Sequence, residues 1–164
     1  LVKKSISGVK SPSGYPYKFI KQYITFMGNV KELEEAAAGH GIFSVSEEYD
    51  GVVRRVPLLS RVGKEIRPAL AIELLRAALG SKSIFVERDA AGVSAIILQA
   101  PGENFKIPTD AQGRIYVHFS PPDPFNTQEN TGRLYISAGD IINGRVPKEK
   151  LAGRFFLFLN LRCG

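Results

Sequence analysis

Two adjacent arginines, Arg54 and Arg55, are the residues whose chemistry is easiest to name. They stand in the stretch EEYDGVVRRVPLL at residues 47–59. A guanidinium group binds carboxylate or phosphate oxygens through paired hydrogen bonds, so two neighbouring arginines could form an anion-binding site. They could also lie exposed to solvent on the edge of a hairpin, without a ligand. The elements that position the two side chains decide between these roles.

Residues 42–59 read as two strands joined at Asp50 and Gly51, a pair that favours a two-residue type I′ turn. In that register Glu47 faces Arg54 across the strands, while the next arginine points to the opposite face. Two arginines on opposite faces cannot hold one ligand between them. The register therefore favours a structural role for the arginine pair.

The same pattern leaves Arg55 without a partner, and it ends the pairing of the second strand near Pro57, which cannot donate to a ladder. Arg55 is thus a candidate for a ligand-binding surface. His118 is a second candidate, because it alternates with apolar residues on the predicted strand 115–120. The polar, proline-rich loop 120–132 is a third, since loops carry function more often than cores do. For each of them a structural or merely exposed role is the alternative.

Motifs of the common catalytic sites are missing from the sequence. There is no Gly-x-Ser-x-Gly elbow, no phosphate-binding Gly-x4-Gly-Lys loop and no His-Glu-x-x-His motif. The two histidines, His40 and His118, have no cysteine or acidic neighbour at metal-ligand spacing. The Gly-His-Gly at 39–41 follows a helix pattern, which is the wrong context for a dinucleotide-binding loop. We therefore expect no catalytic residue, metal site or cofactor.

The net charge of +6 lies in one part of the chain. Residues 1–31 hold six lysines and no acid, and the remaining 16 basic and 16 acidic residues balance one another in residues 32–164. We expect a lysine-rich leader at 1–31, partly ordered from about residue 18, and a folded domain at 32–164. A basic leader suits nucleic acid or an anionic membrane, and a solvated arm is the alternative. The balanced domain lacks a basic stripe, so we expect no nucleic-acid partner for it.

The apolar pattern predicts an α/β (mixed, α+β-like) fold, in which a mostly antiparallel mixed β-sheet carries two or three covering helices. The expected strands are 18–26, the two strands within 42–59, 83–89, 93–99, 115–120 and 155–159. The expected helices are 29–41, with Asn29 as its N-cap, 67–80 and 137–146.

The expected helix at 67–80 has the most regular pattern. Pro68 fits its first turn, and Gly80 fits the position after its end. Glu73 and Arg76 share the polar face. The residues at helical spacing on the apolar face are Leu70, Ala71, Leu74, Leu75, Ala78 and Leu79.

The C-terminal part of the chain offers two smaller signals. Ser137 and Asp140 form a capping-box pattern at the start of the helix 137–146. The single cysteine, Cys163, has no partner for an internal disulfide.

The order and spacing of these segments over residues 18–159 resemble the type-two CHASE domain, the cyclase- and histidine-kinase-associated sensory extracellular domain of bacterial receptors. The shared pattern includes a small-residue helix, Asp-Gly-Val-x-Arg-x-x-Pro-Leu, a proline-initiated leucine-rich helix, and Ser-Ala-x-Asp before Gly-x-Val-Pro. The signature positions, for which we expect structural roles, are Asp50, Gly51, Arg54, Pro57, Leu58, Pro68, Ser137 and Asp140.

This resemblance implies a non-enzymatic sensory module in the extracytoplasmic (periplasmic or extracellular) part of a bacterial inner-membrane protein. It implies a cytoplasmic effector domain in the same polypeptide, most similar to an adenylate or guanylate cyclase, with a histidine kinase or serine/threonine kinase as alternatives. It also implies a homodimer, an unknown small-molecule or environmental signal, and no nucleic-acid partner. The competing hypothesis is a soluble interaction domain that binds nucleic acid or an anionic membrane through its basic leader, and an enzyme of unknown type comes third.

Two departures from the family pattern carry a further expectation. The family has a strand–helix–strand portion upstream and a last strand that continues into a helix, and this chain shows neither. We therefore expect a module that is incomplete at its N-terminal side. A missing neighbour strand would expose a sheet edge, and an exposed edge favours pairing with a second copy.

Overall fold

The computed structural model of the chain describes residues 8–11, 14, 16, 18–45, 47–119 and 136–156. The chain divides into two units, Leu1–His118 and Phe119–Gly164. Some sequence predictions fall outside the described residues, namely the loop 120–132, positions 157–159 of the last strand, and Cys163.

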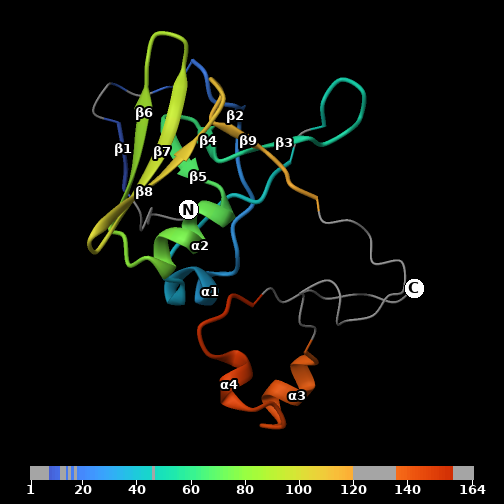
Figure 1. The fold of residues 1–164 in the computed structure, drawn as a ribbon. Helices are drawn as coiled ribbons and strands as arrows, with labels where there is room; N and C mark the ends of the chain where they lie inside the picture. Colours follow the sequence, from blue (N-terminus) through green and yellow to red (C-terminus); the bar gives the residue numbers. More distant parts are fainter. Residues whose placement is uncertain are drawn as a thin grey trace. The chain divides into compact units, whose positions relative to one another are not determined.

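The described part of the first unit forms three small sheets and two helices (Figure 1). The largest sheet has the order β1-β6-β7-β8, from Gly8–Lys10, Ser83–Arg88, Val93–Ala100 and Glu103–Pro108. The second has the order β2-β4-β5, from Gln22–Tyr23, Leu59–Val62 and Glu65–Pro68. The third joins β3, Arg55–Pro57, to β9, Arg114–Tyr116. Only β1–β6 and β2–β4 are parallel among these pairs, so the expected mixed, mostly antiparallel fold is confirmed.

The hairpin of β6 and β7 forms the centre of the largest sheet, as the sequence predicts. Val86 lies opposite Ile96, and both side chains are fully buried. The strands on either side were not predicted. Strand β8 is mostly exposed, and its alternation is limited to Phe105 and Ile107 around Lys106, which is too short to predict a strand. Strand β1 lies within residues 1–31, where a leader was expected, and the boundary between leader and domain stays a prediction.

A second hairpin, β4–β5, has no counterpart among the expected strands. Gly63, with a φ of +60°, allows a two-residue turn between Val62 and Glu65. Pro68 ends β5 opposite Leu59, whereas the sequence predicts it in the first turn of a helix. That prediction is wrong because an edge strand tolerates proline as well as a helix start does.

Helix α2, Leu70–Ala78, confirms the helix predicted at this place. Gly80 follows its end with a φ of +64°, as expected. The N–H of Gly80 donates to the carbonyl of Ala77, and the N–H of Ser81 donates to the carbonyl of Arg76. These two bonds form a Schellman motif, which satisfies carbonyls at the end of the helix.

The predicted faces of α2 are wrong. Glu73 and Arg76 are only 3% and 8% exposed, whereas Leu74 is 41% exposed. The two charged side chains satisfy each other through an ion pair of 2.8 Å. Arg76 also donates to the carbonyls of Ala38 and Ser81, at 3.1 and 2.6 Å. Charges that are paired and hydrogen-bonded in this way can be buried, which the apolar periodicity does not reveal.

Helix α1 is shorter than the helix expected at 29–41, because it spans Lys31–Ala36. Its N-cap position is Val30 rather than Asn29, and no side chain caps it. The N–H of Asn29 instead donates to Glu34 Oε1 at 3.0 Å, so a side chain of the helix reaches back to satisfy the preceding backbone.

The glycines at 39–41 pack the segment after α1 against the start of α2. The N–H of Ile42 donates to the carbonyl of Pro68 at 2.8 Å, and its carbonyl accepts the N–H of Leu70 at 3.0 Å. A Cβ atom at Gly41 would collide with the backbone of Leu70. The Gly-His-Gly segment therefore has a packing role, consistent with its rejection as a dinucleotide-binding loop.

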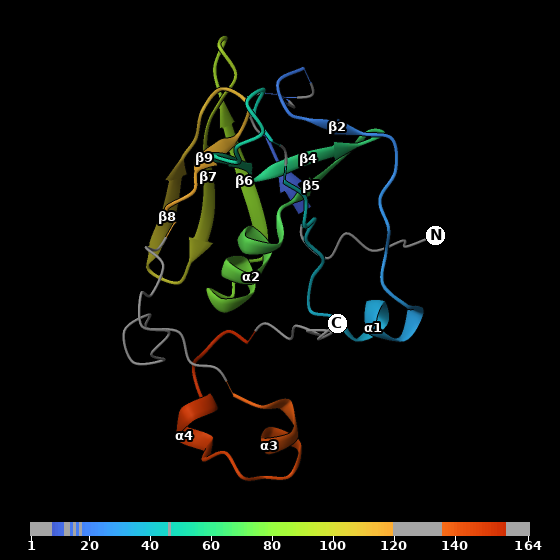
Figure 2. The same ribbon diagram turned by 90° about the vertical axis from the view of Figure 1, so that its right-hand side faces the viewer.

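The core of the first unit collects side chains from the two larger sheets and α2. Figure 2 shows α2 beside the β6–β7 hairpin, and β5 leads directly into it. The expected strand 18–26 forms only as the short β2, but Ile20 ahead of it is buried in this core. The core residues are Ile20, Leu58, Leu59, Ile66, Ile72, Ile84, Val86, Val93, Ile96 and Leu98.

The described part of the second unit holds α3, Ala138–Ile142, and α4, Lys148–Leu151. Ser137 occupies the N-cap position of α3, as expected, but makes no side-chain capping bond. Asp140 pairs instead with Arg145 Nη2 at 2.7 Å. The first two residues of the buried strand expected at 155–159 form no strand and are 62% and 39% exposed, so that prediction is wrong for them.

Candidate binding cleft

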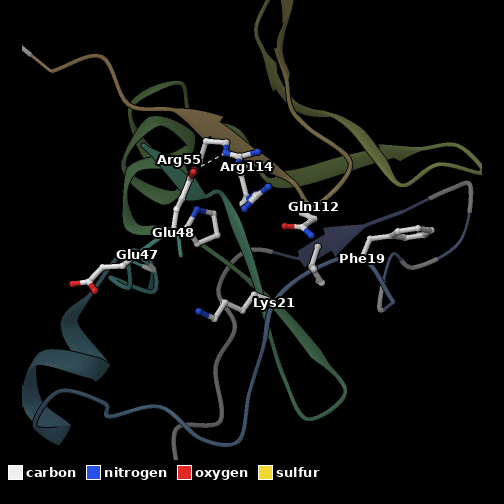
Figure 3. A pocket seen from close by; sticks show the side chains of 9 residues that line it. Phe19, Lys21, Glu47, Glu48, Arg55, Gln112 and Arg114 are labelled. Atoms are coloured by element: carbon white, nitrogen blue, oxygen red, sulfur yellow. Dashed lines mark hydrogen bonds and ion pairs between the residues drawn. The ribbon is translucent and has the colours of Figure 1, made fainter. Parts of the chain in front are cut away.

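A cleft of about 340 Å³ lies beside the β3–β9 sheet in the first unit (Figure 3). It combines basic, acidic, amide and apolar side chains from segments far apart in the sequence. Its lining consists of Phe19, Ile20, Lys21, Glu47, Glu48, Arg55, Pro57, Gln112 and Arg114.

The pairing of β3 with β9 places two arginines on one face of the small sheet. Arg55 lies opposite Tyr116 in the register. Pro57 lies opposite Arg114. Directly opposite residues, and residues two apart, share a face, so these four side chains point the same way. Ile115, between the two β9 residues, packs against the core.

The loop before β3 brings Glu48 to the cleft. The N–H of Glu48 donates to the carbonyl of Val52 at 3.1 Å, and the N–H of Gly51 donates to the carbonyl of Glu48 at 2.9 Å. The loop therefore holds three residues and ends on Gly51, whose φ is +78°. The predicted two-residue type I′ turn is wrong, because Tyr49 joins Asp50 and Gly51 in the loop. The predicted pairing of the two strands within 42–59 is wrong as well, because the described residues of 43–49 form no strand and β3 pairs with β9 instead.

The loop between β8 and β9 repeats this arrangement and supplies Asp110. The N–H of Asp110 donates to the carbonyl of Arg114 at 3.0 Å. Gly113, with a φ of +72°, donates its N–H to the carbonyl of Asp110 at 2.9 Å. The Oδ1 atom of Asp110 accepts the N–H groups of Gln112 and Arg114, each at 2.9 Å. Each three-residue loop thus follows an acidic residue and ends on a glycine.

The acidic and basic side chains around the cleft form an alternating network. Glu48 Oε1 accepts from Arg55 Nε at 2.8 Å, and Glu48 Oε2 lies 3.5 Å from Arg54 Nη1. Asp110 Oδ2 accepts from Arg114 Nε at 2.8 Å and lies 3.7 Å from Arg55 Nη1. Figure 3 shows Arg55 and Arg114 together at one end of the cleft. Asp110 therefore holds two guanidinium groups next to each other.

The predicted partners of the arginine pair are wrong. Arg54 pairs with Asp50 Oδ2 at 2.7 Å rather than with Glu47 across a hairpin. Arg55, expected to lack a partner, is in contact with two carboxylates. The three-residue loop brings Glu48 to both arginines, so they share a partner although they are neighbours in sequence.

The network lowers the pKa of its carboxyl groups. The hydrogen bond from Arg55 holds the pKa of Glu48 below its usual range. Burial acts to raise the pKa of Asp110, but hydrogen bonds from the N–H and guanidinium of Arg114 outweigh it and lower that pKa. Both carboxyls are therefore ionised at neutral pH and act as permanent partners of the arginines.

The structure separates the sequence candidates. Arg55 and Pro57 line the cleft, and β3 ends at that proline as expected. His118 is exposed and follows β9, which covers only part of the strand expected at 115–120. His40 contacts Glu34 at 3.2 Å. The remaining signature residues lie in the loop before β3 (Asp50, Gly51), in or next to β3 (Arg54, Leu58), in β5 (Pro68) and in the second unit (Ser137, Asp140).

Three important residues of the cleft were not among the sequence candidates, namely Glu48, Asp110 and Arg114. A signal for them exists in the spacing acid-x-x-Gly, which occurs in these loops as EYDG at 48–51 and as DAQG at 110–113, although it also occurs at 89–92 and 129–132. Each of these loops leads to a short strand that carries an arginine. The motif becomes informative once the two strands are known to pair.

Two other features are absent from the described part of the chain, a metal-binding cluster and a membrane-spanning helix. No three His, Cys, Asp or Glu side chains gather there in a way that would hold a metal ion. No helix among those residues has the length and apolar character needed to cross a membrane.

The fold and the cleft define a small mixed α/β domain with charged groups around a cavity of the size that small-molecule sites have. A family model described as the CHASE2 domain matches residues 4–158. The chain therefore belongs to the CHASE2 domain family, and the resemblance found in the sequence is confirmed. CHASE2 domains are extracellular sensory domains. Searches of curated proteins and of solved structures gave no match.

Proposed function

We propose that this chain is the extracytoplasmic sensory domain of a bacterial membrane receptor and that it regulates an adenylate or guanylate cyclase in the same polypeptide. The observation that carries the proposal is the family match over residues 4–158, because CHASE2 domains are extracellular sensory domains. The cleft beside β3 and β9 offers a place where a small signal molecule binds.

The way the cleft is built supports this role. Its lining comes from residues 19–21 ahead of β2, from 47–48, and from the paired strands β3 and β9 with the loop between β8 and β9. The carbonyl of Lys21 accepts the N–H of Arg61 at 2.9 Å, which ties the first segment to β4. A ligand that contacts all of these segments favours the arrangement in which they lie together. A sensor transmits such a preference for one arrangement.

The receptor is proposed to act as a homodimer. Cyclases of the kind coupled to this family form their active sites between two copies. A sensory domain that changes how two copies sit against each other would then change the cyclase rate.

The complete reading frame gives the first test. The proposal expects membrane-spanning segments around this chain and a cyclase domain on the cytoplasmic side. If the reading frame encodes a kinase domain in place of the cyclase, the proposed effector is wrong and the proposed sensory role stands. A reading frame with no membrane-spanning segment would contradict the proposal.

The second test measures cyclic-nucleotide production by the full-length protein in a host that lacks its own cyclase. Deletion of the segment that corresponds to this chain should change the basal rate and abolish responses to compounds added outside the cell. A full-length protein with an inactivated cyclase domain is the control for background. An unchanged basal rate together with unchanged responses would contradict a sensory role.

A further inference from the structure

We propose that the cleft binds a small organic anion, with its acidic group held by Arg114 and Arg55 and its apolar part against Ile20 and Pro57. The inference rests on the proposed sensory function and names the class of ligand for its site. It follows from the donors, the charges and the apolar wall of the cleft.

The two arginines have donors left for a ligand. Arg114 engages Asp110 through Nε, and in the described part of the chain neither of its Nη atoms has a hydrogen-bond partner. Arg55 uses Nε for Glu48 and directs Nη1 toward Asp110, which leaves Nη2. A guanidinium group carries five N–H donors in a fixed fork, and the remaining donors suit the two oxygens of a carboxylate.

Asp110 fixes these donors before a ligand arrives. Its Oδ1 atom is held by the N–H groups of Gln112 and Arg114, so its Oδ2 atom faces the two guanidinium groups. The side chains of Arg55 and Arg114 are only 28% and 27% exposed. A ligand therefore meets donors that are already oriented and partly desolvated, which reduces the entropy lost on binding.

The charges of the cleft favour an anion over a cation. Glu48 is already shared by two arginines. Figure 3 shows the carboxylate of Glu47 pointing away from the other labelled side chains. In the same view Gln112 lies beside Arg114, and its side-chain amide adds an NH2 group to the lining. This group supplies a further donor to an acidic ligand.

The apolar wall distinguishes an organic anion from an inorganic one. Ile20 and Pro57 are buried residues of the lining, and Phe19 is half-buried. The volume of about 340 Å³ stands near the lower end of the range for small-molecule sites. Phosphate would leave the apolar wall uncovered, whereas a carboxylate with a branched or aromatic group covers it and gains from burial.

The experiment is isothermal titration calorimetry of the chain with benzoate, isobutyrate and inorganic phosphate. We expect benzoate or isobutyrate to bind with a dissociation constant on the order of 1 mM or tighter, and phosphate to bind at least about tenfold more weakly. Phosphate binding as tight as the carboxylates would overturn the assignment to organic anions. Absence of binding by all three would overturn the site.

Arg114→Gln should weaken carboxylate binding by about 10- to 100-fold, because it removes charge-assisted hydrogen bonds. Arg114→Lys keeps the charge but loses the fork, so its loss should be intermediate. If Arg114→Gln does not fold, the affinity of Arg114→Lys for the carboxylates still tests the site. Arg145→Gln, in the second unit, is the control and should leave binding unchanged. Equal binding by the wild-type chain and both Arg114 variants would show that the anion binds elsewhere.

The site and the sensory function can fail separately. Suppose that no anion binds the wild-type chain, while deletion of this chain still alters cyclic-nucleotide output of the full-length receptor. The ligand assignment then fails and the proposed function stands. If deletion has no effect although benzoate binds the wild-type chain and not Arg114→Gln, the site stands and the proposed function fails.

Discussion

Asp110 accepts two backbone N–H groups through one carboxylate oxygen and faces two arginines through the other. Asp110→Asn keeps an oxygen for the loop and removes the charge. We expect it to lower the unfolding free energy in urea by about 0.5–1.5 kcal/mol, because partly exposed ion pairs contribute little each. Asp89→Asn is the matched control, since Asp89 accepts the N–H groups of Ala91 and Gly92 but has Val93 four residues on. Equal losses of unfolding free energy in the two variants would show that the contacts of Asp110 with Arg55 and Arg114 do not stabilise the chain.

Glu48 makes the stability of the chain depend on pH. The hydrogen bond from Arg55 lowers the pKa of Glu48 in the folded chain below its ordinary value of 4.5. The unfolded chain therefore takes up this proton first as the pH falls. The stabilisation is present above the ordinary value and is lost as the pH falls through the folded-state value.

Glu48→Gln removes this contribution. The urea midpoint of the variant should therefore change less than that of the wild type between about pH 5 and pH 3. Thermal or chemical denaturation at several pH values measures the difference. Parallel curves for the two proteins would show that Glu48 is not held by the arginines in solution.

The sequence identified Arg55 as a candidate ligand-binding residue, but it did not predict the two carboxylates that contact it, Glu48 and Asp110. A strand pattern places one residue relative to its neighbours on the same strand, whereas the partner strand β9 is fixed only by tertiary pairing. The Asp-Gly rule also misled, because it predicts a two-residue turn and the glycine here closes a three-residue loop. The three-residue loop places Glu48, rather than Glu47, beside the two arginines.

At the scale of the elements, α2 depends on its buried ion pair. The side chains of Glu73 and Arg76 are 4% and 9% exposed. Arg76→Met removes the guanidinium partner of a buried carboxylate, so it should lower the unfolding free energy by about 3–5 kcal/mol. Urea denaturation followed by circular dichroism measures the loss. The double variant Glu73→Leu/Arg76→Met should regain much of it, because the uncompensated charge is gone.

Lys106→Met is the matched control for this prediction. Lys106 pairs with Glu87 at 2.6 Å, but the two side chains are 58% and 43% exposed. Water screens such a pair, so the expected loss is at most about 1 kcal/mol. A loss of the same size in Arg76→Met and Lys106→Met would mean that the pair on α2 is not buried.

The sequence predicted those elements best whose apolar period matches their burial. The β6–β7 hairpin is one of these, because Val86 and Ile96 fall on the buried face. It failed for β8, where only Phe105 and Ile107 alternate with a polar residue, and for the face of α2, where paired charges replace apolar side chains. Pro68 misled for a similar reason, since the same residue is compatible with a helix start and an edge strand.

At the scale of the whole molecule, we predict self-association. Strand β8 is the last strand of its sheet in the described part of the chain, and Phe105 on it is 48% exposed. An edge of this kind favours pairing with a second copy. Size-exclusion chromatography with light scattering should give twice the 18.0 kDa mass of one chain at high concentration. A monomeric mass at every concentration would contradict the prediction.

If the cleft is the sensory site, a ligand of the cleft changes the cyclase rate, and one measurement tests both the binding and the sensory role. It is the cyclic-nucleotide output of the full-length receptor in spheroplasts, recorded while benzoate is added outside. We expect the output of the wild-type receptor to change with benzoate and the Arg114→Gln receptor to need at least about tenfold more benzoate for the same change. A cyclic-nucleotide output that does not change with benzoate, or that changes equally in both receptors, would contradict a sensory role for the cleft.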